Sequence, residues 1–106
     1  MRLNEYQDCT EETAVYPSEH ALSYLSLGLN DESGEVAGAV KKYMRGDYGE
    51  SELRSRVKGE AGDVLWYWAR LLDELDLDAE DVMHSNRDKL LDRADRDQIR
   101  GDGDNR

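Results

Sequence analysis

Four acidic residues occur in two pairs, and within each pair the acids are three positions apart. The first pair is Glu32 and Glu35, and the second is Glu60 and Asp63. Side chains three positions apart on a helix lie on one face, about 5–6 Å apart at Cβ, so both acids of a pair can reach one cation. Carboxylate oxygens are the preferred ligands of hard divalent cations such as Mg²⁺ and Mn²⁺. The spacing therefore predicts a divalent-cation site built by two helices.

Both pairs lie on the helix face that should pack against the rest of the protein. At about 100° per residue, Glu32 and Glu60 share their faces with aliphatic side chains. These are Leu25, Leu29, Val36, Leu53, Val57 and Val64. Burying a carboxylate is costly unless a cation or a hydrogen-bond donor compensates it. A bound metal accounts for four such acids more simply than salt bridges within the chain.

Three alternatives to a magnesium site could also account for the buried acids. Arg56 and Arg70 could form salt bridges with them, although two arginines account for one or two acids more easily than for four. A di-iron bundle needs a Glu-x-x-His motif on two helices, and only the segment Asp81–His84 approaches it. A non-catalytic interaction protein could use acids on an apolar face to select its partner chain.

The remaining sequence predicts the helices that would hold these acids. Pro17 ends the first helix, Ser18 and Asp78 are suited to cap the second and fourth, and the glycines of RGDYGE separate the second from the third. Apolar spacing indicates helices over residues 3–15, 18–45, 51–75 and 79–95. Four helices with short connections predict an all-α four-helix bundle.

Composition limits the class of protein. The chain has 106 residues, with 25 acids against 14 bases and a net charge of -11, which predicts no nucleic-acid or anionic-membrane partner. Low Lys with abundant acid fits either a high-salt habitat or an Arg-biased genome. No segment approaches the roughly 20 apolar residues of a membrane span. The single cysteine, Cys9, is expected to be a small buried side chain in a reducing, cytoplasmic protein.

The motif DExGE at residues 31–35, followed by EAGD at residues 60–63, resembles the signature of the MazG-like all-α nucleoside triphosphate pyrophosphohydrolases. The similarity continues in GDVLWYWARL and NRDKLLDR, and with LNEYQ near the start, YP before the second helix and the tail GDGDNR it covers nearly the whole chain. The resemblance implies Mg²⁺-dependent hydrolysis of an NTP or dNTP to the monophosphate and pyrophosphate. It also implies that the acids of both pairs are metal ligands. Asp31 stands where the family usually has its first Glu, so its role is open.

Five further residues are candidates for substrate binding. Asn86, Lys89 and Arg93 share one face of the last helix, and the family carries Asn and Lys at the first two positions, which implies phosphate contacts. Lys42 could also contact phosphate, and Tyr67, one turn after the second acid pair, could stack on a base. The alternatives are a solvated helix face for the polar residues and a core position for Tyr67.

Residues 1–100 are predicted to form a single helical domain, followed by a flexible polar tail, GDGDNR, at residues 101–106. The alternative for the tail is that it closes over phosphate, with Arg106 as a clamp. The small apolar inventory and the family both predict a homodimer or homotetramer that completes the bundle, with the substrate pocket shared between subunits.

Overall fold

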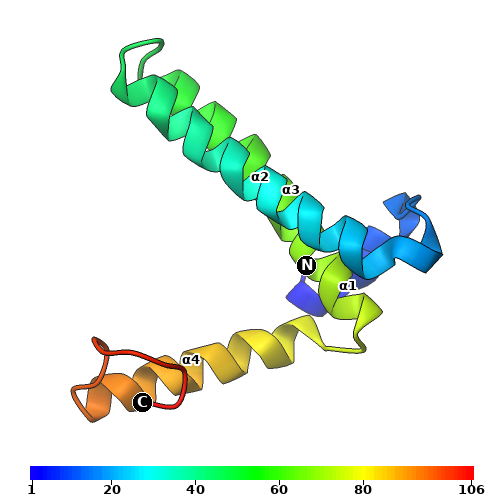
Figure 1. Cartoon of the computed structure of the whole chain (residues 1–106), viewed down its shortest axis with the longest axis vertical. Helices are drawn as coiled ribbons and strands as arrows, with labels where there is room; N and C mark the ends of the chain where they lie inside the picture. The colour runs from blue at the N-terminus through cyan, green and yellow to red at the C-terminus, as the bar shows by residue number, and fades with distance from the viewer.

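Four α-helices and two short 3₁₀ helices make up the chain, and a computed structural model describes all of residues 1–106 (Figure 1). No strand is present, so the prediction of an all-α protein with four helices is confirmed. No helix combines the length and apolar character that crossing a membrane requires. The elements are α1 (Leu3–Cys9), η1 (Thr10–Thr13), η2 (Ser18–His20), α2 (Ala21–Met44), α3 (Glu50–Glu74) and α4 (Ala79–Asp95).

The later helices begin and end close to the predicted residues. The bounds of α4 are those predicted, and the prediction that Asp78 caps it is confirmed. The carboxylate of Asp78 accepts hydrogen bonds from the backbone N–H groups of Glu80 and Asp81 at 2.9 and 3.2 Å. These bonds satisfy two of the donors that a helix start leaves unpaired.

The N-terminal segment differs from its prediction. One α-helix over residues 3–15 is wrong, because α1 ends at Cys9 and the chain tightens into η1, where the Thr10 hydroxyl donates to the carbonyl of Gln7 at 2.6 Å. Such side-chain bonds compete with continuation of a helix. Ser18 does not cap α2, because it begins the separate turn η2. Cys9 is exposed, so the expectation of a buried thiol is also wrong.

An antiparallel pair of α2 and α3 forms the main body of the molecule (Figure 1). The turn between them contains Gly46 with φ +89°, a conformation that glycine adopts without steric cost. Leu25 is the largest side chain that is fully buried. The other buried residues of the pair are Ala21, Ala39, Ala69, Arg70 and Leu72. The small alanines allow the two helices to approach closely.

A polar network attaches the N-terminal segment to the base of the pair. The side-chain amide of Gln7 donates to the carbonyl of Leu77 at 2.8 Å and accepts from the backbone N–H of Ala79 at 3.0 Å. The buried guanidinium of Arg70 donates to the Tyr16 hydroxyl at 3.2 Å. The Gln7 bonds hold the start of α4 against α1, and the Arg70 bond holds the segment after η1 against α3.

The single chain leaves its bundle open. Beyond its first turns, α4 diverges from the α2–α3 pair, and it packs on α1 and α3 but not on α2 (Figure 1). The Cα radius of gyration is 16.6 Å, whereas a compact domain of this length has about 13 Å. Only 10 of 106 residues are buried. Four helices are therefore present, but within one chain they do not enclose a common core.

Candidate functional site

Three of the four predicted metal ligands come together between α2 and α3. Glu32 from α2 and Glu60 and Asp63 from α3 each offer a carboxylate oxygen, and these oxygens all lie within 4.8 Å of one another. Glu32 and Glu60 are half-buried, and Asp63 is exposed. The cluster forms because the acids share the packing faces of two antiparallel helices. Its three hard oxygen donors, open to solvent on one side, fit a divalent cation such as Mg²⁺.

No basic side chain neutralises this carboxylate cluster. Arg56 instead pairs with Glu52 at 2.9 Å, and Arg70 pairs with Asp73 at 3.2 Å. None of the ion pairs in the chain includes any of the four predicted ligands. Salt bridges within the chain therefore do not account for these acids, of which Glu32 and Glu60 are half-buried, and the prediction that all four are buried is wrong for Glu35 and Asp63.

The electrostatics of the cluster favour a cation. Burial raises the pKa of the Glu32 carboxyl above its ordinary value, and a hydrogen bond with Glu60 and the negative charges of Asp63, Glu60 and Asp31 raise it further. Each of these causes except the hydrogen bond acts by making the ionised carboxylate unfavourable. A divalent cation would reverse the sign of the local field and stabilise all three carboxylates.

Glu35 lies one turn beyond Glu32 on α2, is exposed and is not among the three clustered acids. Lys42 lies ten residues from Glu32, about 15 Å along the helix axis. It is beside the α2–α3 turn, where its charge helps to lower the pKa of Asp47, after the hydrogen bond from Arg45 and the charge of Arg45. The geometry therefore separates Lys42 from the carboxylate cluster within one chain.

A shallow pocket of about 370 Å³ adjoins the carboxylate cluster. Its lining consists of Tyr24, Leu27, Gly28, Asp31 and Tyr67. The Tyr67 hydroxyl has a raised pKa, first because of burial and then because of Tyr24 and the charges of Glu32 and Asp31. Tyr67 thus lines the pocket and is close enough to the cluster for the charge of Glu32 to act on it. Asp31 also lines the pocket, and its charge acts on Glu32.

Tyr67 reaches this place because residue 28 has no side chain. A Cβ built on Gly28 would lie 2.1 Å from Cε1 of the Tyr67 ring. We expect Gly28→Ala to displace the ring and to destabilise the protein by about 1–3 kcal/mol, the usual cost of overpacking. Urea unfolding followed by circular dichroism measures this difference.

Gly38→Ala is the matched control, since a Cβ at Gly38 on the same helix meets no atom within 4 Å. There the change should be neutral or stabilising, because alanine favours helix by up to about 1 kcal/mol over glycine. Equal stability of the two variants would contradict the close approach of Tyr67 to α2.

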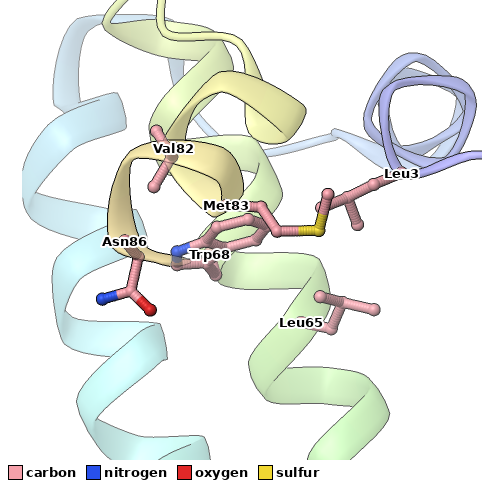
Figure 2. A pocket seen from close by; sticks show the side chains of 6 residues that line it. All are labelled: Leu3, Leu65, Trp68, Val82, Met83 and Asn86. Carbon is pink, nitrogen blue, oxygen red and sulfur yellow. The ribbon is translucent and has the colours of Figure 1, made fainter. Parts of the chain in front are cut away.

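The three predicted phosphate contacts on α4 lie apart from the carboxylate cluster in the single chain. Asn86 lies at the edge of an apolar groove (Figure 2) that is otherwise lined by Leu3, Leu65, Trp68, Val82 and Met83. Lys89 and Arg93 follow one and two turns later, and both contact Asp104 of the C-terminal tail. The three side chains share a face, as their spacing predicts, but α4 does not approach α2.

Two residues near these sites were not identified from the sequence. Tyr6 of α1 lies near Asp63, whose charge raises the pKa of the Tyr6 hydroxyl after the larger effect of burial. Asp104 contacts both α4 cations. The spacing of residues along the helices does not predict either contact. Each depends on how a separate segment, α1 or the C-terminal tail, folds back on the helices.

Comparison with known proteins gives a family match over most of the chain. The model of the MazG nucleotide pyrophosphohydrolase domain matches residues 21–96, a range that includes the carboxylate cluster and all of α4. The "Gene 37 protein" of Mycobacterium phage L5 is 41% identical over 114 aligned residues, which cover both chains completely. No solved structure matches.

Proposed function

Because the chain belongs to the MazG nucleotide pyrophosphohydrolase domain family, we propose that it hydrolyses a nucleoside or deoxynucleoside triphosphate to the monophosphate and pyrophosphate, with Mg²⁺ as cofactor and Mn²⁺ as a possible substitute. The observation that carries the proposal is the carboxylate cluster of Glu32, Glu60 and Asp63. It has no cationic partner and lies on the packing faces of α2 and α3. A stable protein keeps uncompensated acids in such a place only at a cost, which metal binding would offset.

Four acidic residues would bind the metal in the proposed reaction. Glu32, Glu60 and Asp63 would hold the metal, and Glu35 would join them as a fourth ligand by turning its flexible side chain toward Glu32. A bound divalent cation neutralises phosphate oxygens and lowers the pKa of a coordinated water.

Five other residues would contact the substrate, three of them on α4. Asn86, Lys89 and Arg93 carry amide, ammonium and guanidinium groups that suit phosphate oxygens. Tyr67 would offer its ring to the base or sugar from the pocket beside the cluster. Lys42 would contact phosphate only in an oligomer that brings the α2–α3 turn of one protomer to the substrate site of another.

The direct test is pyrophosphate release from a panel of common ribo- and deoxyribonucleoside triphosphates, with Mg²⁺ and with EDTA. We expect release that depends on Mg²⁺ for at least one nucleotide. Mg²⁺ should also raise the Tm of the protein without substrate, because it relieves repulsion among the clustered carboxylates. A non-catalytic interaction protein would release no pyrophosphate and gain no thermal stability from Mg²⁺, and this result would contradict the proposal.

We further propose that the active form is a homodimer or homotetramer. The single chain exposes 7705 Å², whereas a compact protein of 12.1 kDa exposes roughly 6,000 Å². The excess of roughly 1,700 Å² per chain corresponds to an obligate homodimer interface, which buries about 2,000–5,000 Å² in total.

A second copy explains two features of the single chain at once. It would cover exposed apolar side chains of the groove in Figure 2, such as Leu65 and Met83. It would also bring the α4 of one protomer toward the carboxylate cluster of its partner. The substrate site would then be shared between subunits.

A further inference from the structure

The two cations that the proposed function assigns to phosphate are already bound to an anion of the same chain. Nζ of Lys89 lies 2.7 Å from Oδ1 of Asp104, and Nη2 of Arg93 lies 3.2 Å from the same oxygen. Nη2 of Arg93 also donates to the backbone carbonyl of Asp104 at 2.6 Å. Hydrogen bonds from Lys89 and then Arg93 hold the pKa of the Asp104 carboxyl below its ordinary value. An ionised oxygen bridging two cations is the arrangement that a phosphate oxygen would make.

The C-terminal tail folds back toward Lys89 and Arg93 on α4. After α4 the chain turns back and lies along the end of the helix (Figure 1). Gly101 and Gly103 have φ of +143° and +84°. Residues other than glycine rarely adopt such values.

The last residue ties this turn together. The guanidinium of Arg106 donates to the carbonyls of Gln98, Ile99 and Gly103 at 3.1, 3.0 and 2.6 Å, and Arg96 donates to the carbonyl of Arg106. Arg106 therefore closes the loop that presents Asp104 and does not itself face Lys89. Arg93 is buried although it lies on an otherwise exposed part of α4.

We propose that the tail GDGDNR is an internal competitor for the phosphate site, in which Asp104 occupies Lys89 and Arg93 until a polyphosphate displaces it. This inference rests on the proposed function for the role of these two cations. Displacement is feasible because the Asp104 side chain is 77% exposed, and its pair with the partly exposed Lys89 is of the solvent-accessible kind that contributes little to stability. Arg93 is buried, so its guanidinium gains from any anion that replaces Asp104 there. A triphosphate offers several anionic oxygens where Asp104 offers one, so it binds the same pair more strongly.

The test measures anion binding without catalysis. Isothermal titration calorimetry with inorganic tripolyphosphate, in metal-free buffer of low ionic strength, gives the Kd of the full-length protein and its variants. We expect Asp104→Asn to lower the Kd about two- to fivefold, the range that follows from losing one exposed competing ion-pair partner. The gain should shrink as added salt screens the charges.

Asp102→Asn is the matched control, because it removes the same charge from the same tail and Asp102 forms no ion pair or side-chain hydrogen bond. If both variants bind equally, general charge explains the result and the proposal is overturned. Weaker binding by Asp104→Asn would overturn it too, since Asp104 would then be positioning the cations. So would an absence of tripolyphosphate binding in all three proteins.

Pyrophosphate release from nucleoside triphosphates, measured on the same three proteins with Mg²⁺ added, separates the two proposals. Tighter tripolyphosphate binding by Asp104→Asn without any turnover would support the internal competitor and contradict the proposed hydrolysis. Turnover together with equal tripolyphosphate binding by Asp104→Asn and Asp102→Asn would support the proposed hydrolysis and contradict the internal competitor.

Discussion

Replacing Glu60 by glutamine should reduce pyrophosphate release by about 1,000-fold or more while leaving the helix content almost unchanged. The amide keeps the shape of the side chain but loses the negative charge of one of three clustered carboxylates. A loss of that size corresponds to about 4 kcal/mol of transition-state stabilisation, which is reasonable for a ligand of the metal that neutralises the phosphates. Steady-state assays with saturating Mg²⁺, together with far-ultraviolet circular dichroism, measure both parts of the prediction.

The same substitution should make the metal-free protein more stable. Glu60 raises the pKa of Glu32 both by hydrogen bonding and by its charge, so removing the charge relieves a repulsion between ionised groups. A group whose folded pKa is raised loses stability as the pH rises through the range between its unfolded and folded pKa. The gain in Tm for Glu60→Gln should therefore appear above the ordinary pKa of a glutamate and vanish in acid. An inactive variant that melts higher would separate loss of metal binding from misfolding.

Glu50→Gln is the control on the same helix. Glu50 is exposed and reaches only Arg54, at 3.9 Å, so its loss should leave turnover within about twofold of the unmodified protein and change stability little. If Glu60→Gln and Glu50→Gln are equally active, the carboxylate cluster does not hold the catalytic metal.

Local features of the sequence predict the helices and the carboxylate cluster because both depend on short-range geometry. The phase of Glu32 and Glu60 on their helices follows from the angle per residue alone, and two antiparallel helices must then bring these faces together. The cap at Asp78 is equally local, since its side chain needs only the next three residues. The change from α-helix to 3₁₀ helix after Cys9 shows that two local preferences can compete. The Thr10 hydroxyl donates to the Gln7 carbonyl, which a longer α-helix would use for a backbone hydrogen bond.

Contacts between distant segments could not be predicted in the same way. Tyr6 lies near Asp63 only because α1 packs on α3. Asp104 meets Lys89 and Arg93 only because the tail reverses direction. A single sequence contains the residue types for these contacts, but no fixed spacing relates them.

The divergence of α4 is the most informative of these non-local features. Spacing places Asn86, Lys89 and Arg93 on one face of α4, yet α4 diverges from the α2–α3 pair and does not pack on α2. A phosphate bound by the carboxylate cluster and by these donors at once requires either closure of α4 within one chain or a second chain. The groove between α1, α3 and α4 is already lined by apolar side chains that remain accessible, which favours a second chain.

Introducing a charge into this groove should therefore dissociate the protein and abolish its activity. Met83 is 44% exposed in the single chain and points along the groove between Leu3 and Leu65 (Figure 2). An aspartate buried there by a partner would cost several kcal/mol, enough to raise the dissociation constant by about 100-fold or more. Light scattering after size exclusion should show an oligomer for the unmodified protein and a monomer with a lower Tm for Met83→Asp. His84→Asp, on the neighbouring exposed position, should remain oligomeric and active. An unmodified protein that is monomeric, with a Tm independent of its concentration, would instead require α4 to close over its own carboxylate cluster.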